Sequence, residues 1–275
     1  MLTENIITGE KFQYKCKLYI GETNENFSVN PTLGLTEKNK LLKDINNNFD
    51  NPDIIFCYSH LLLKFVEKIK YFNNPFILIS GNSDGNIIEN SEHLEIANNN
   101  KIISWYAQNL SFNHNKVKPL PIGIANSQWK HGNIPELINI INNIPQKTNF
   151  IYFNFNIYTN FEKRMHCYNM LSQCIEFLPD INAVDHFHRL STHKFCICPE
   201  GNGLDSHRIW ECYYLKVVPI VLNNQFIQIL KKEYNIPMII LNNWDEIKNI
   251  NFHYESYNFD YEPILNLINN IHSKY

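Results

Sequence analysis

Short apolar runs that alternate with longer amphipathic runs limit the fold of this sequence more than any other feature. In the first half the apolar runs cover residues 17–21, 53–58, 76–80, 102–105 and 117–121. The clearest amphipathic run between them covers residues 60–71. Strands separated by helical segments are typical of a parallel sheet with crossover helices, so the pattern predicts an α/β protein.

The second half repeats the alternation. Strands are predicted over residues 148–154, 194–198, 217–222 and 238–241, and helices over 160–177, 206–215, 226–233 and 263–272. A predicted helix ends at Pro145, just before this second series begins. We therefore expect two doubly wound Rossmann-like lobes, residues 1–147 and 148–275, that face a cleft. Sheets of this kind bind ligands beyond the carboxyl ends of their strands.

Composition argues against several classes of protein. The 275 residues carry a net charge of −3, and the lysines and arginines are scattered, so no nucleic-acid partner is indicated. No apolar run is long enough for a membrane span, and the first residues lack a basic segment followed by an apolar one. The seven cysteines are odd in number and widely spaced, which is typical of reduced thiols. We expect a cytoplasmic protein.

The most informative segment reads as strand, glycine turn, helix and strand between residues 193 and 221. Pro199 ends the first strand, and Gly201 and Gly203 allow the backbone to turn and to approach a ligand closely. Asp205 or Ser206 can cap the helix that follows. This is a suitable frame for an anion at a helix amino-terminus.

Arg208 in the first turn of that helix would add a cation to the free N–H groups, which suits a diphosphate. Glu211, three residues further, shares its helical face and could accept hydrogen bonds from ribose hydroxyls. Asn202, Asp205 and His207 complete the predicted donor-binding residues. The alternative is a plain tight turn, with Arg208 and Glu211 paired on a solvated helix face.

The run K-F-C-I-C-P-E-G-N-G-L-D-S-H-R-I-W-E-C, with V-V-P-I-V, resembles the carboxy-terminal signature of the exostosin-like glycosyltransferases. The matching positions are Pro199, Gly201, Ser206, Arg208, Glu211 and Pro219. Looser likeness continues over residues 77–86, 120–133 and 153–164. The resemblance implies a GT-B architecture, a nucleotide-sugar donor on the carboxy-terminal lobe, uracil as the favoured base, and no metal.

Three further residues are candidates for the chemistry. Arg164, at the start of a predicted helix, could be a second cation for the donor phosphate, or a surface arginine. Asp84, in a glycine-bordered loop, could be the general base that takes the acceptor proton, or part of a simple turn. His131 could serve as the base instead, or be a packed loop residue.

A metal site is not predicted. His186, His188 and His193 lie near Asp185, and Cys196 and Cys198 follow, but His-x-His and Cys-x-Cys lack the paired spacing of structural zinc sites.

The sequence therefore predicts a glycosyltransferase that moves a sugar from a nucleoside-diphosphate sugar to a glycan or other hydroxyl acceptor, with inversion and without a cofactor. The alternatives are a non-catalytic nucleotide- or glycan-binding module with a degenerate GT-B fold, and a purely structural α/β protein.

Overall fold

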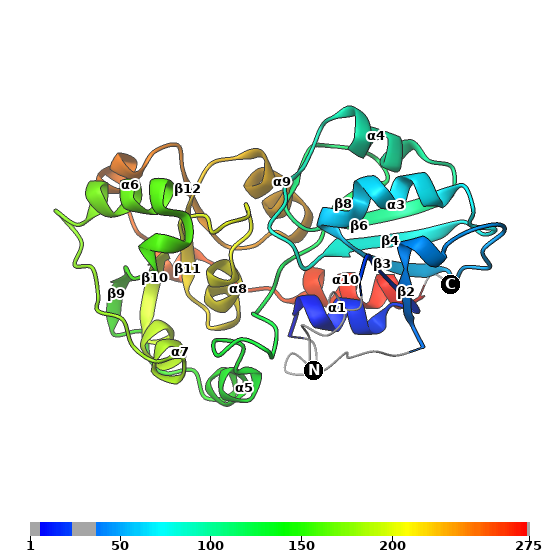
Figure 1. Ribbon diagram of the computed structural model, residues 1–275. Helices are drawn as coiled ribbons and strands as arrows, with labels where there is room; N and C mark the ends of the chain where they lie inside the picture. Colours follow the sequence, from blue (N-terminus) through cyan, green and yellow to red (C-terminus); the bar gives the residue numbers. More distant parts are fainter. Residues whose placement is uncertain (1–5, 24–36, 274–275) are drawn as a thin grey trace. The chain divides into compact units, whose positions relative to one another are not determined.

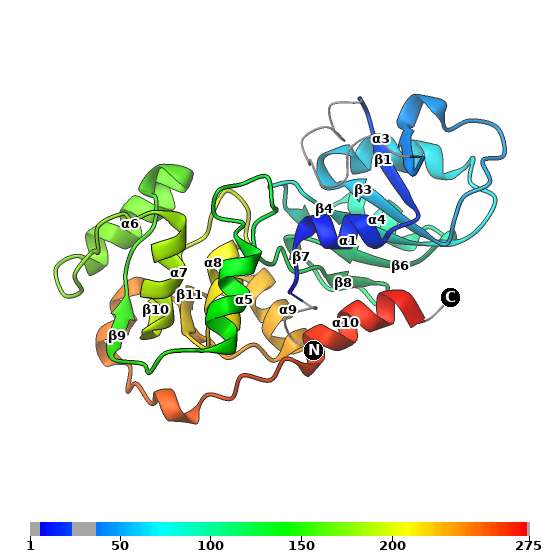
Figure 2. The same ribbon diagram turned by 90° about the horizontal axis from the view of Figure 1, so that it is seen from below.

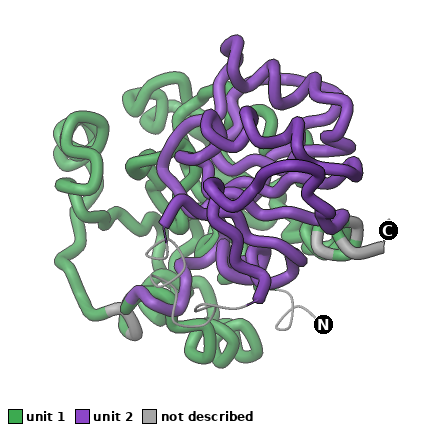
Figure 3. Tube along the Cα trace, turned by 45° about the vertical axis from the view of Figure 1, so that its right-hand side comes forward, with its two compact units in different colours: residues 1–6, 130–274 green, residues 7–129, 275 purple. Residues whose placement is uncertain are grey.

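The computed structural model describes residues 6–23 and 37–273, which form two compact units (Figure 3). Unit 2 comprises Ile7–Trp129, and unit 1 comprises Ile6 and residues 130–273 of the described chain. Each unit is built around its own parallel sheet.

The sheet of unit 2 has six parallel strands in the order β2-β1-β3-β4-β6-β8 (Figure 1). Their bounds are β1 Leu18–Gly21, β2 Asn39–Leu41, β3 Ile54–Tyr58, β4 Phe76–Gly81, β6 Ile102–Ala107 and β8 Val117–Pro119. The chain passes from β1 to β2 on one side and returns to β3 on the other. This reversal is the mark of a doubly wound sheet.

Helices cover both faces of that sheet. In Figure 1, α3 (Leu62–Ile69) and α4 (Ser91–Asn98) lie on one face and α1 (Gly9–Lys15) on the other. Two short strands, β5 (Ile87–Ile88) and β7 (Leu110–Ser111), pair beside it, and the 3₁₀ turns are η2 (Leu42–Asp44) and η3 (Ser59–Leu61). Side-chain caps begin two of these helices, because Thr8 accepts from the backbone N–H of Lys11 and Asn90 from that of His93.

The sheet of unit 1 has four parallel strands in the order β12-β11-β10-β9. They are β9 Asn149–Tyr152, β10 His193–Ile197, β11 Val218–Leu222 and β12 Ile239–Leu241. These strands follow one another across the sheet in sequence order, so the reversal seen in unit 2 is not repeated among them. The ends of β9 and β10 therefore lie side by side, at the edge where sequence analysis places the donor.

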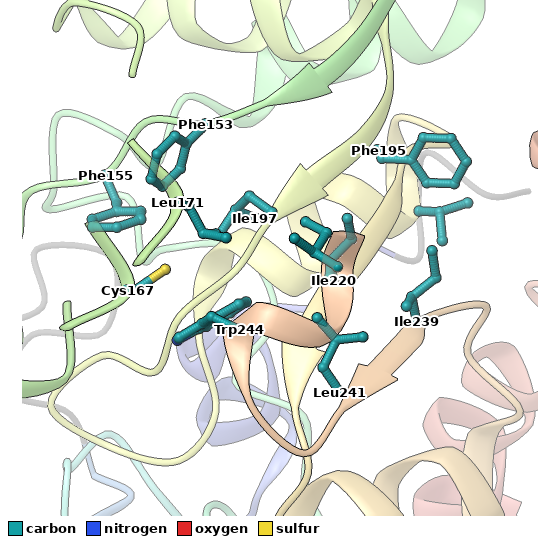
Figure 4. Close-up of a cluster of buried hydrophobic side chains, with 12 residues drawn as sticks. Phe153, Phe155, Cys167, Leu171, Phe195, Ile197, Ile220, Ile239, Leu241 and Trp244 are labelled. Carbon is teal, nitrogen blue, oxygen red and sulfur yellow. The ribbon is translucent and has the colours of Figure 1, made fainter. Parts of the chain in front are cut away.

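The core of unit 1 explains how its two faces are covered. Buried residues of α6 (Phe161–Leu171) and of η5 (Trp244–Asn249) pack on one face of the sheet, with Leu171 and Trp244 among them (Figure 4). On the other face α5 (Ile134–Asn142), α7 (Ala183–Ser191) and α8 (His207–Tyr214) lie side by side (Figures 1 and 2). The remaining elements are η4 (Ile157–Asn160), α9 (Gln225–Tyr234), η6 (Tyr254–Ser256) and α10 (Glu262–Ser273).

The boundary between the units falls after Trp129, earlier than the boundary predicted after Lys147. The reason is that α5 belongs to unit 1, where it contacts α7: Glu136 Oε1 lies 2.7 Å from His188 Nε2. The proline at the end of the helix was a correct helix signal, but it does not mark the boundary.

Parallel sheets with helices on both faces confirm the predicted α/β class and its Rossmann-like lobes. Helix α7 was not predicted, although Phe187 and Leu190 are fully buried on it. Among the described residues, no helix combines the length and the apolar character that crossing a membrane requires.

Candidate functional site

The turn between β10 and α8 is held by side chains from the turn itself. Ser206 is the helix cap, as predicted: its Oγ accepts from the N–H of Arg208 at 3.4 Å. Asp205 is 3% exposed, and its Oδ1 accepts from the N–H of Ser206 at 2.8 Å and from Nε1 of Trp210 at 2.9 Å. These contacts help to fix the backbone of the turn, and a contact of Asp205 with the donor stays a prediction.

Arg208 joins the first turn of α8 to the end of β9. Its Nε donates to Glu211 Oε2 at 2.9 Å, and its Nη1 donates to the carbonyl oxygen of Asn154 at 2.7 Å. The guanidinium carbon lies 5.4 Å from the centre of the Tyr152 ring. With its side chain 19% exposed, Arg208 is a fixed and largely desolvated cation.

Glu211 is the buried partner of that cation. It is 4% exposed, and its Oε2 also lies 3.0 Å from Nε2 of His186, whose Nδ1 is 3.0 Å from the hydroxyl of Tyr152. Burial alone would raise the pKa of Glu211, but His186 and Arg208 outweigh burial and hold it well below its usual range. Although burial opposes it, Glu211 in turn raises the pKa of Arg208. The pair is charged at neutral pH.

Arg164 supplies the second cation, from the first turn of α6. Its Nε donates to the carbonyl oxygen of Glu200 at 2.9 Å and its Nη1 to that of Asn156 at 2.8 Å. The residue is 9% exposed, and a Cβ at Gly201 would lie 3.6 Å from its Nη2. Burial, and after it the charge of Arg208, lowers the pKa of Arg164 to about 10, which leaves it charged at neutral pH.

The two cations at this edge of the sheet have different partners. Arg164 and Arg208 are both held in place, whereas Glu211 is the carboxylate that pairs with one of them. Of the other nearby acids, Glu200 directs its carboxylate to Lys163, and Asp205 directs its own to Trp210 and the N–H of Ser206. Two fixed guanidinium groups beside a helix amino-terminus favour an anion with more than one negative charge.

His131 belongs to unit 1 and lies close to these groups. Its ring centre is 6.1 Å from that of His207, the first residue of α8. Burial, followed by the charge of His207, lowers the pKa of His131, while Glu211 acts in the opposite direction. The structure therefore brings this predicted residue into the electrostatic field of the Arg208 and Glu211 pair, as a largely neutral imidazole.

Asp84 lies in unit 2, in the loop after β4. Its side chain is exposed, and its backbone carbonyl accepts from Asn109 Nδ2 at 3.4 Å. The residue is a reasonable turn residue, and its part in catalysis stays a prediction.

The remaining predicted residues lie on the turn as expected, with Pro199 and Gly203 buried and Asn202 exposed. A small pocket adjoins the turn, lined by Cys198, Glu200, Leu204, Ser206, Ile209, Val221, Leu222, Asn224 and Ile227. Sequence analysis missed Tyr152 and considered His186 only as a metal ligand. The signal for Tyr152 was available, because it ends the strand beside β10.

Comparison with known proteins leaves the chain without an assigned family. No family model and no curated protein matches it. Among solved structures it is similar to the UDP-GlcNAc 2-epimerase from Methanocaldococcus jannaschii, with 10% identity and a TM-score of 0.35 over 91% of this chain and 82% of that one. A likeness this low carries no weight for function.

Proposed function

We propose that this chain is a nucleotide-sugar-dependent glycosyltransferase that holds the donor diphosphate between Arg164 and Arg208. One observation supports this most: two guanidinium groups are fixed after the ends of β9 and β10, Arg208 by Glu211 and one backbone carbonyl oxygen, and Arg164 by two backbone carbonyl oxygens. A diphosphate supplies the negative charge that the neutral carbonyl oxygens around Arg164 do not.

The donor would lie across the turn from Gly201 to Ser206. The N–H groups at the start of α8 and the two arginines would then bind the phosphate oxygens. The bond between C1 of the sugar and the diphosphate oxygen breaks as the acceptor oxygen bonds to C1, and negative charge develops on the leaving diphosphate. Cations already fixed in place stabilise that charge without reorganisation.

Glu211 would have two tasks. Its Oε2 positions Arg208, and no described residue donates a hydrogen bond to Oε1. That second oxygen is the atom we assign to the ribose hydroxyls. It follows that Glu211→Gln would weaken donor binding in two ways, through the position of Arg208 and through the contact with the ribose hydroxyls.

The acceptor proton needs a base, and His131 is our first choice in unit 1. A neutral imidazole beside the leaving-group site can take the proton as the acceptor oxygen attacks. Asp84 of unit 2 is the second choice. The exostosin-like signature in the turn supports sugar transfer, with uracil as the base, over other reactions of nucleotide sugars.

Calorimetric titration with UDP and GDP, without metal, tests the donor site. We expect micromolar binding of UDP, weakened about tenfold or more by Arg164→Ala, which is roughly 1.4 kcal/mol. Gly201→Ala should weaken UDP binding similarly, because its methyl group would stand on the donor turn beside Arg164 and obstruct the ligand. The fold should tolerate the change, since the added Cβ makes an ordinary 3.6 Å contact with Arg164 Nη2.

The matched control is Arg189→Ala, since Arg189 also bonds a backbone carbonyl in unit 1 but at an exposed position. It should leave the affinity unchanged. Equal binding by wild type and Arg164→Ala, or no binding of either nucleotide, would overturn the donor site.

A second prediction concerns the base. With a panel of UDP-sugars and hydroxyl acceptors, UDP release by His131→Ala should fall about 100-fold or more, with little change in the affinity for UDP. Because the pKa of His131 lies below its ordinary value of 6.5, wild-type turnover should be constant above that pH and decline in more acidic buffer.

An equally large loss in Asp84→Asn, with none in His131→Ala, would assign the role of general base to Asp84. Tight binding with no turnover would favour the non-catalytic module.

A further inference from the structure

Three thiols meet in the core of unit 1, beneath the turn. Cys196 and Cys198 lie two residues apart at the end of β10 and face the same side, where Cys212 of α8 joins them. All three sulfur atoms lie within 4.8 Å of one another, and the Cys198 and Cys212 sulfurs are 3.8 Å apart. The residues are 0%, 3% and 0% exposed.

This spacing is close to what a metal ion requires. An ion about 2.3 Å from each of three sulfur atoms in a plane places those atoms about 4 Å apart. The cluster needs small side-chain movements to reach that geometry. In the part of the chain that the structure describes, no histidine, carboxylate or fourth cysteine joins the group.

Binding of a cation to these sulfur atoms as thiolates would displace the thiol protons, which pass to solvent.

We propose that Cys196, Cys198 and Cys212 form a three-coordinate site for a soft d¹⁰ metal ion of the Cu(I) class. Thiolate ligands select such ions. Zn²⁺ shares the preference for thiolate but takes a fourth ligand, which a closed and buried cluster of three sulfurs does not offer. The Cys-x-Cys pair alone did not predict the site, because the third ligand comes from the next helix.

Anaerobic titration of the full chain with Cu(I), against a competing Cu(I) chelator, tests the proposal. The background is Cys174→Ser, which removes the exposed thiol. We expect about one equivalent of Cu(I) per chain, with thiolate-to-metal absorption in the ultraviolet, and much weaker binding of Zn²⁺ in a parallel titration.

Cys198→Ser and Cys212→Ser, each made separately, should lose at least tenfold in Cu(I) affinity. Cys167→Ser is the matched control, since Cys167 is a fully buried thiol of the same unit outside the cluster, and it should retain full binding. Circular dichroism checks that each variant is folded. Should one variant fail to fold, the other variant and the wild type still decide between the outcomes.

No stoichiometric uptake by the wild type, or uptake that Cys167→Ser reduces as much as Cys212→Ser, would overturn the proposal. One equivalent of Zn²⁺ bound tightly through the same thiols would overturn the preference for Cu(I).

Discussion

Arg208→Ala is expected to destabilise unit 1 by about 3–5 kcal/mol, because it removes one partner of a buried ion pair and leaves the other behind. Glu211 is 4% exposed, and without Arg208 it keeps only the contact with His186. The carbonyl oxygen of Asn154 loses its donor as well. Urea unfolding at neutral pH measures the loss. The control, Arg189→Ala, removes a partly exposed arginine whose hydrogen bond to Pro179 lies at the surface, and should change the free energy of unfolding by about 0.5 kcal/mol or less.

The same ion pair gives this prediction a pH dependence. The pKa of Glu211 is lower in the folded chain than its ordinary value of 4.5. Its stabilising contribution is therefore complete above about pH 4.5 and is lost progressively as the pH falls towards the folded pKa. The difference between wild type and Arg208→Ala should narrow in acid. A difference that stays constant from pH 7 to pH 3 would show that lost packing, and not charge, causes the destabilisation.

Gly123→Ala is the second change with a large expected effect, in unit 2. Gly123 has φ of +68°, and a Cβ there would lie 2.2 Å from the carbonyl oxygen of Ile7. That oxygen belongs to backbone that is held in place, since the N–H of Ile124 donates to it at 2.8 Å. We expect a loss of about 3 kcal/mol or more, from left-handed strain and from displacement of the segment before α1.

Thermal unfolding of Gly123→Ala and Gly85→Ala side by side is the measurement. Gly85 is the matched control, because the nearest atom to a Cβ there is Ser83 Oγ at 3.9 Å. Its melting temperature should match that of the wild type. A wild-type melting temperature in Gly123→Ala as well would mean that the loop around residue 123 can shift at little cost.

Much of the fold followed from local patterns. The strands at residues 54–58, 76–81 and 218–222 are continuous apolar runs, which identify buried parallel strands without knowledge of their neighbours. The strand order did not follow, because it depends on which side of β1 each crossover takes. Helix α7 was not predicted because its histidines were considered only as metal ligands. The spacing of Phe187 and Leu190, which is typical of an amphipathic helix, was not taken into account.

The site was predictable where its contacts are local. The Ser206 cap and the proximity of Arg208 to Glu211 were predictable because cap geometry and a spacing of three residues depend on the helix alone. The contacts of Arg208 with Asn154 and of Glu211 with His186 join residues 54 and 25 positions apart in the sequence, so no local pattern reveals them. For the same reason the bond between the Asp205 carboxylate and Trp210 was not predicted.

The bond between Asp205 and Trp210 also gives the protein an internal optical reporter. Trp210 and Trp244 are buried in unit 1, and of these two Trp210 hydrogen-bonds to the turn that we assign to the donor. Indole emission depends on the polarity and hydrogen bonding around its N–H group, so rearrangement of this turn would alter the intrinsic fluorescence of the chain. Occupancy of the turn can thus be followed in unlabelled protein, at the concentrations and speeds that stopped-flow mixing allows.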